Sequence, residues 1–175
     1  MEIEIRPATE RDAEPIVDLL TPIVEAGIYT VMQGPITVED QLAFMRELPG
    51  RAIYLAAVSS ETEGLVGIQD VQPVSGSDGV YHAGDISTFV ALDARGNGIG
   101  RALMRSTVEL ARERGFTVLC ANVRADNPDA VAFYESQGFR VIGTAERRVR
   151  VNDCNADQIL MERWIDEDPS ARKAD

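Results

Sequence analysis

Histidine and cysteine are scarce in this chain of 175 residues, which has one histidine and two cysteines. A lone His82 argues against a zinc site built from histidines, and neither Cys120 nor Cys154 has a second cysteine at metal-ligand spacing. We therefore expect no metal and no disulfide framework. No run approaches the ~20 apolar residues that a membrane span needs, so we expect no membrane association. The first residues are charged rather than apolar, which predicts no secretion signal and a cytoplasmic protein.

Positive charge is also limited, because 17 basic side chains face 29 acidic ones and the net charge is −12. That balance argues against nucleic acid as a partner. The basic residues are concentrated: residues 95–150 hold ten basic and six acidic side chains, whereas residues 1–94 hold four and sixteen. A basic segment in an acidic chain indicates either an anionic ligand at that segment or a solvated surface with unequal blocks of charge.

The length and the apolar content of 45% predict one domain over residues 1–165, followed by a polar tail at 166–175. Periodicity and the glycine and proline boundaries predict an element order of β-α-α-β-β-β-α-β-α-β-β. This order is an α+β fold with a mixed sheet, not the strict alternation of a doubly wound protein. The predicted strands are 2–6, 52–59, 65–74, 81–92, 117–123, 139–151 and 158–164, the last two joined by a turn at 152–153. The predicted helices are 9–27, which Pro15 and Pro22 kink or split, and 37–47, 96–114 and 128–136.

The strongest local feature is a strand-to-helix junction with glycines at the alternate positions 96, 98 and 100. Alternate glycines let backbone N–H groups turn toward one point, and the helix that follows adds positive partial charge. This combination indicates an anion cradle, with phosphate as its usual occupant. The stretch lacks the Gly-Lys-Ser/Thr of a P-loop and fits no G-x-G-x-x-G register. A purely structural glycine turn stays open as the alternative.

A second segment, Asn127-Pro-Asp-Ala-Val-Ala-Phe-Tyr-Glu-Ser-Gln-Gly-Phe139, follows a buried strand and holds a short helix. Arg95-x-x-Gly98-x-Gly100, followed by Asn127-x-x-Ala130-x-x-Phe133-Tyr134-x-x-x-Gly138-Phe139, resembles the GCN5-related N-acetyltransferase (GNAT) superfamily. Residues 84–90 and the ending Gln158-Ile-Leu-Met-Glu-Arg resemble its phosphinothricin-acetyltransferase-like and ribosomal-protein-acetylating branches. The sequence does not separate these two branches.

The resemblance implies a mostly antiparallel sheet that opens into a V between its fourth and fifth strands and holds acetyl-CoA there. The implied reaction moves the acetyl group to a primary amine, on a small molecule or a peptide N-terminus, by direct attack in a ternary complex. The backbone of Phe89 and Val90 would pair with the pantetheine arm, which Asn127 and Phe133 would also contact. The pyrophosphate would lie on Arg95, Gly96, Asn97, Gly98, Ile99, Gly100 and Arg101.

The resemblance also implies the catalytic groups. Tyr134 would face the sulfur and act as the general acid, the alternative being a core tyrosine. Asp85 stands where the phosphinothricin-acetyltransferase-like branch carries a glutamate, and it would act as the general base, through water. The alternative for Asp85 is a structural role at a strand start. His82 is a rival base. Cys120 has no nearby histidine in the sequence and reads as a small buried residue rather than as a nucleophile.

The acceptor side is expected to involve residues 29–32 and 147–152, whose composition names no acceptor. The acidic N-terminal half favours a neutral or cationic acceptor over an anionic one. A non-catalytic acyl-CoA-binding sensor or regulatory module is the alternative function. A homodimer is compatible with the sequence, which does not specify the oligomeric state.

Overall fold

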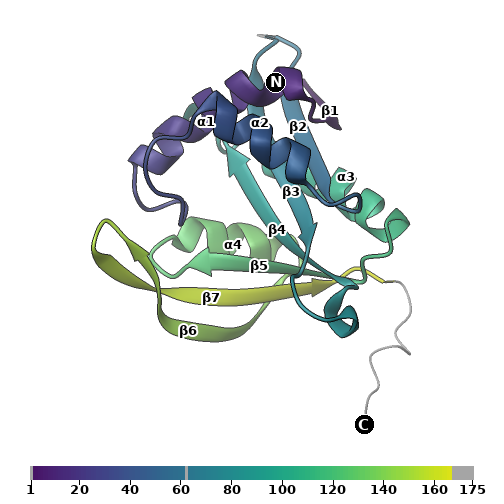
Figure 1. Ribbon diagram of the computed structural model, residues 1–175, viewed down its shortest axis with the longest axis vertical. Helices are drawn as coiled ribbons and strands as arrows, with labels where there is room; N and C mark the ends of the chain where they lie inside the picture. The colour runs from purple at the N-terminus through teal and green to yellow at the C-terminus, as the bar shows by residue number, and fades with distance from the viewer. Residues whose placement is uncertain (1, 62, 167–175) are drawn as a thin grey trace.

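Seven strands form one sheet in the order β1-β2-β3-β4-β5-β7-β6 within the part of the chain that the structure describes (Figure 1). The structure is a computed structural model that describes residues 2–61 and 63–166, so the predicted tail lies outside it except for Asp166. The strands are β1 (Ile3–Pro7), β2 (Ile53–Ser59), β3 (Leu65–Pro73), β4 (Ala83–Val90), β5 (Val118–Arg124), β6 (Arg140–Val151) and β7 (Cys154–Trp164). Every neighbouring pair is antiparallel except β4 and β5, which are parallel.

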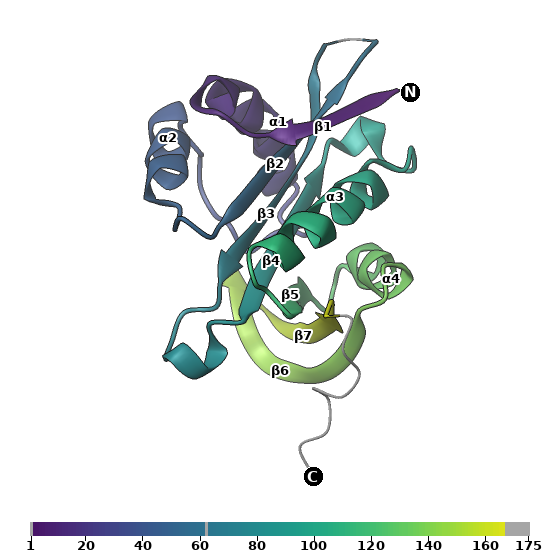
Figure 2. The same ribbon diagram turned by 90° about the vertical axis from the view of Figure 1, so that its right-hand side faces the viewer.

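Helices cover both faces of the sheet (Figure 2). They are α1 (Ala13–Glu25), α2 (Val38–Glu47), α3 (Ile99–Glu113) and α4 (Pro128–Ser136). On one face, Ile16 and Ile23 of α1 pack with Ile68 of β3. On the other face, the apolar stripe of α3 packs on the central strands together with Phe116 and Phe139. The predicted α+β fold and its element order are therefore confirmed, and no described helix is long and apolar enough to cross a membrane.

The sheet opens where β4 and β5 stop pairing. Their register has three positions, which join Ala83–Asp85 to Val118–Cys120. Beyond these positions β4 continues to Val90 on β3 alone, and β5 continues to Arg124 on β7 alone. Residues 86–90 and 121–124 therefore have no strand between them, and the predicted V between the fourth and fifth strands is confirmed.

Two predicted helix boundaries are wrong. The helix predicted over 96–114 begins only at Ile99, because Gly96 and Gly98 have φ of 81° and 79°, which a right-handed helix does not allow. The helix predicted over 9–27 begins as one 3-10 turn at Glu10–Asp12 and becomes α1 only at Ala13. Of the predicted kink or split at Pro15 and Pro22, the split does not occur, since α1 runs unbroken to Glu25. Pro15 lies in the first turn of α1, where a backbone N–H needs no partner within the helix.

Two predicted strands also differ in length. The strand predicted over 81–92 is shorter, because tight turns at Asp78–Val80 and Leu92–Ala94 bound it. The strand predicted over 158–164 is longer and begins at Cys154. Asn152 and Asp153 both have positive φ, 50° and 60°, as in the two-residue turns that match the twist of a hairpin. Pairing therefore starts directly after the predicted turn, which is confirmed.

Gly84 sits where the V closes, and it should not tolerate a side chain. A Cβ at this position would lie 2.5 Å from Cγ1 of Val71 and 3.1 Å from Cδ1 of Phe116, both of which are buried. Gly84→Ala is therefore expected to lower the free energy of unfolding by about 1–3 kcal/mol, measured by urea denaturation. Gly143→Ala is the control, because a Cβ at Gly143 meets nothing within 4 Å. Equal losses in the two variants would contradict the packing argument.

Candidate active site

A pocket of about 480 Å³ lies at the open end of the V. The end of β4, the glycine-rich junction, the start of α3 and helix α4 line it, so the two sequence motifs meet in one place. Most of the predicted site residues line this pocket: Phe89, Val90, Arg95, Gly96, Gly98, Ile99, Gly100, Arg101, Asn127, Phe133 and Tyr134. Two predicted residues, Asn97 and Asp85, do not line it, and their proposed roles stay predictions.

The glycine-rich junction directs the start of α3 at this pocket. The first backbone N–H groups of α3, from Ile99 to Arg101, precede the first intrahelical bond, which runs from Ala102 N to Gly98 O. The first turn holds no acidic side chain. These N–H groups and the helix dipole favour a negatively charged occupant. The space beside Gly98 is open to such an occupant, because a Cβ built at Gly98 meets no atom within 4 Å.

Gly100 and Asn97 have structural partners that the sequence pattern did not reveal. A Cβ at Gly100 would lie 2.9 Å from Cε2 of Phe133, so this glycine lets α3 approach the aromatic ring of α4. The side chain of Asn97 donates to the carbonyl of Ala94 at 3.0 Å and braces the loop from within. Both observations explain why these residue types occupy the junction whether or not a ligand is bound.

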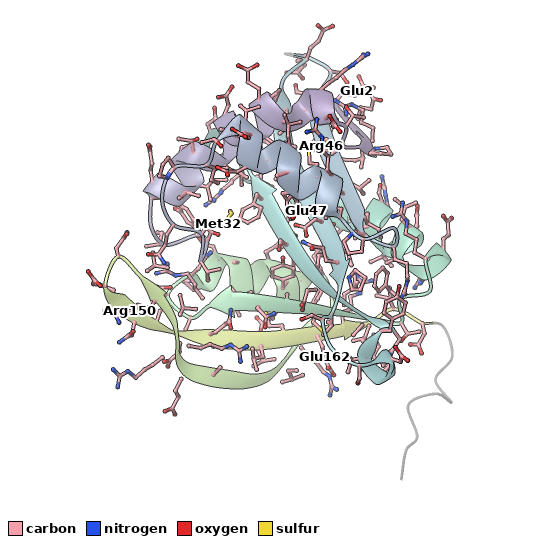
Figure 3. All side chains as sticks on the ribbon, in the orientation of Figure 1. Glu2, Met32, Arg46, Glu47, Arg150 and Glu162 are labelled. Atoms are coloured by element: carbon pink, nitrogen blue, oxygen red, sulfur yellow. The ribbon has the colours of Figure 1, made fainter. Side chains whose placement is uncertain are left out.

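The two segments predicted for the acceptor side lie together beside the pocket. Gln33, next to the 29–32 segment, donates from Nε2 to the carbonyl of Arg150 at 3.0 Å. Arg124 of β5 donates to the carbonyl of Thr30 at 3.1 Å. Figure 3 shows Met32 on the α1–α2 loop and Arg150 on the β6–β7 hairpin, both toward the left of the view. The loop between α1 and α2 is thus fastened to the β6–β7 hairpin and to the end of β5.

This loop also reaches the glycine-rich junction. The guanidinium of Arg95 lies 4.0 Å from the centre of the Tyr29 ring, and both residues line the pocket. A cation over an aromatic face is attracted by the ring quadrupole. Tyr29 was expected on the acceptor side and Arg95 on the phosphate side, so this contact joins the two halves of the site.

Tyr134 is both a core residue and a wall of the pocket. Its ring packs edge-on between Phe133 and Phe139, with centroids 5.1 and 5.0 Å away. Its hydroxyl lies 3.0 Å from Oγ1 of Thr88, which in turn accepts a hydrogen bond of 2.7 Å from Nε2 of Gln69. Burial raises the pKa of Tyr134 to about 12, so the phenol keeps its proton at any working pH. Sequence reasoning missed Thr88 and Gln69, whose residue types are ordinary in strands.

The opposite face of β3 and β4 carries two carboxyl groups. The register pairs Gln72 with Asp85 and Asp70 with Ser87, so these four side chains share the face that α1 and α2 cover. Asp70 is buried, and burial raises its pKa to about 6 although Gln72 donates to it at 3.0 Å. Burial also raises the pKa of Asp85, which lies where the V is still closed.

The remaining candidates for catalysis are less suited to it. Burial, with Asp85 and Glu162 nearby, raises the pKa of Cys120 to about 11, which keeps the thiol neutral and agrees with its reading as a non-nucleophile. His82 is exposed at the start of β4 and does not line the pocket. Among residues 2–61 and 63–166, no group of three or more His, Cys, Asp or Glu side chains could hold a metal ion.

The fold and the two converging motifs are those of an acetyltransferase, and comparison with known proteins establishes the family. The model of the "Acetyltransferase (GNAT) family" matches residues 25–139, which is more than half of the chain. The chain therefore belongs to the GNAT family of acetyltransferases.

Relatives come from both branches that the sequence resembles. A phosphinothricin N-acetyltransferase of Streptomyces coelicolor is 24% identical over 145 residues, which are 82% of this chain and 85% of the relative. The crystal structure of a ribosomal-protein-alanine N-acetyltransferase from Brucella melitensis is 28% identical with a TM-score of 0.83, covering 92% of this chain and 99% of that one. A phosphinothricin acetyltransferase from Sinorhizobium meliloti, crystallised in complex with acetyl-CoA, shares the fold at 20% identity and a TM-score of 0.88. That match covers 97% of this chain and 92% of the Sinorhizobium chain.

The buried carboxyl of Asp70 predicts a pH-dependent effect on stability. Because its folded pKa is raised, the folded state binds this proton more tightly than the unfolded state, and stability falls as pH rises from about 4 toward 6 and stays lower above it. Asp70→Asn removes the buried charge and is expected to raise the free energy of unfolding by about 2 kcal/mol at pH 8, and by much less at pH 4.5. Urea denaturation at both pH values measures this.

The exposed aspartate Asp78 provides the matched control, since Asp78→Asn should change stability little at either pH. A loss of stability for Asp70→Asn at pH 8 would show that the hydrogen bonds to the ionised carboxylate outweigh its desolvation.

Proposed function

We propose that this GNAT protein transfers the acetyl group of acetyl-CoA to a primary amine within the V. The observation that carries this proposal is the pocket at the open end of the V, where the glycine-rich junction and Tyr134 meet. Beyond Asp85, β4 has no partner strand on the β5 side, so its backbone at Phe89 and Val90 is free to pair with the amides of a pantetheine arm. The arm would thus lie in the sheet as an added strand.

The phosphate end of the cofactor fits the start of α3. The N–H groups from Gly98 to Arg101 and the charge of Arg101 would hold the pyrophosphate. Asn127 would contact the arm: its side-chain oxygen already accepts from Ala130 N at 3.3 Å, which leaves its amide N–H groups for a ligand. The basic segment 95–150 is then the half of the chain that holds the cofactor.

The reaction needs an amine without its extra proton, since an ammonium ion has no lone pair to attack with. As the amine attacks, a C–N bond forms, the C–S bond breaks, and the electron pair of that bond goes to sulfur. Tyr134 donates its hydrogen bond to the sulfur as negative charge develops there. A thiol has a pKa of ~8.5, so a phenol with a pKa of about 12 stabilises this charge chiefly through the hydrogen bond. The nitrogen loses one proton, to water or through water to Asp85, and the departing thiolate gains one, so the products are the amide and the free thiol of CoA.

The acceptor that suits this site is a neutral or cationic amine, on a small molecule or at a peptide N-terminus. From β3 to the end of the junction turn, residues 65–94 hold no lysine or arginine, while Asp70 and Asp85 share one face there. Two arginines beside the pocket have partners already, since Arg124 is paired with Asp126 and Arg95 stacks on Tyr29. The relatives named for phosphinothricin and for ribosomal-protein alanine support a small molecule and a peptide N-terminus as acceptor classes. Phosphinothricin carries anionic groups, so that relative counts against the charge argument, which the panel below tests.

A panel of amines tests the function. Acetyl-CoA would be incubated with a simple alkylamine, a polyamine, an alanine-initiated peptide and phosphinothricin, and the free thiol would be followed. We expect thiol release with the neutral or cationic amines and little with phosphinothricin, whose anionic groups meet the acidic face. A best substrate with two anionic groups would overturn the charge argument. Binding of acetyl-CoA without thiol release on any amine would indicate a non-catalytic acyl-CoA-binding module.

Replacement of Gly98 tests the phosphate site. Gly98 and Gly34 have nearly the same backbone, φ of 79° and 78°, and a Cβ at either position meets nothing within 4 Å. Gly98→Ala and Gly34→Ala should therefore cost similar stability, about 1 kcal/mol, from left-handed backbone strain. Only Gly98→Ala should weaken acetyl-CoA binding, by at least 10-fold in calorimetry, because only Gly98 lines the pocket. Equal affinities in the two folded variants would contradict the phosphate site.

A further inference from the structure

A chain of three side chains runs from the middle of the sheet to the wall of the pocket. Gln69 of β3 and Thr88 of β4 are directly opposite in the register and project on the face that α3 and α4 cover. Nε2 of Gln69 donates to Oγ1 of Thr88 at 2.7 Å, and that oxygen lies 3.0 Å from the hydroxyl of Tyr134. The chain ends at Tyr134, which lines the pocket.

The first bond of this chain has a fixed direction, whereas in the second bond either hydroxyl can donate. The Thr88 oxygen accepts from Gln69, so its own proton remains available and can be donated to the oxygen of Tyr134. With its oxygen accepting from Thr88, Tyr134 is left with its own O–H to direct into the pocket. Hydrogen bonds in such a chain polarise one another in this same sense.

Gln69 is an unusual residue for its position if packing alone matters. Its side chain is fully buried in the centre of the sheet, with an exposed fraction of 0%. Its Oε1 has no hydrogen-bond partner among the described residues. An unsatisfied buried carbonyl is destabilising, and leucine would fill similar space without this cost. The feature that leucine could not supply is the N–H donated to Thr88.

We propose that Gln69 and Thr88 are positioning residues that turn the phenolic proton of Tyr134 toward the sulfur of the thioester. This inference rests on the proposed function, in which Tyr134 faces that sulfur. The ring of Tyr134 is already fixed between Phe133 and Phe139, so only the rotation of its O–H is left to be set. A hydroxyl that donated to Thr88 instead would have its proton turned away from the reacting atoms.

Thr88→Val, which keeps the shape of the side chain and removes its hydroxyl, tests the effect on catalysis. With the best amine of the panel, we expect kcat to fall about 10-fold or more, while KM for acetyl-CoA changes less than 2-fold. Thr88→Ser keeps a hydroxyl and should retain most of kcat. In a Tyr134→Phe background, Thr88→Val should have no further effect, because no phenolic proton remains to be turned.

The pKa of the phenol reports, without turnover, whether Thr88 and Gln69 act on the phenol oxygen. For this measurement Tyr134 would be replaced by 3,5-difluorotyrosine, a more acidic phenol, and titrated by fluorine NMR. If Thr88 donates to the phenol oxygen, it stabilises the phenolate, so both Thr88→Val and Gln69→Leu should raise this pKa. A pKa that is unchanged or lowered in both variants would mean that neither side chain acts on the phenol oxygen, which overturns the proposal.

The two measurements separate this inference from the proposed function. A fall in kcat for Thr88→Val that is equally large with Tyr134 present and in the Tyr134→Phe background would overturn the positioning role and leave acetyl transfer intact. Failure of the wild-type protein to acetylate any amine would overturn the proposed function, while the titration would still report whether the chain acts on the phenol oxygen. Thermal unfolding of each variant confirms that it is folded before either measurement.

Discussion

The candidate active site depends on the short pairing between strands β4 and β5. The two strands share three register positions and then separate, while β4 continues on β3 and β5 continues on β7. In most sheets an unpaired inner strand edge would be a defect, since its N–H and C=O groups need partners. Here the unpaired edges form the inner walls of the V, and the pocket lies at its open end. A ligand with amides of its own can satisfy edges that water would otherwise solvate.

Close packing holds the parts of this opening at fixed distances. Gly84 allows β4 to lie against Val71 and Phe116 where the V is closed, and Gly100 allows α3 to lie against Phe133 at the pocket. The ring of Tyr134 is held in turn by Phe133 and Phe139. The positions of the N–H groups at the start of α3 and of the Tyr134 hydroxyl therefore follow from contacts between apolar side chains. Such contacts resist displacement because protein interiors are close-packed.

The sequence predicted the elements and the opening well, and it predicted contacts poorly. Apolar periodicity and glycine or proline boundaries revealed every described strand and α-helix, and the paired motifs indicated that 95–101 and 127–134 would meet. The boundary errors at 96 and 81–92 came from backbone angles and tight turns, which periodicity does not detect. Gln69 and Thr88 left no signal, because a cross-strand hydrogen bond depends on register between segments distant in sequence.

Strand alternation places the residues proposed for the thioester and those proposed for the acceptor on opposite faces of the sheet. Thr88 projects toward α4 and Tyr134, whereas its neighbours Ser87 and Phe89 project toward α1 and α2. A change at one residue of β4 therefore reaches one side only. Substitutions on the side toward α1 and α2 would therefore leave the wall formed by Thr88 and Tyr134 unchanged. Relatives named for phosphinothricin and for a ribosomal-protein alanine share one scaffold with this chain, as such a division allows.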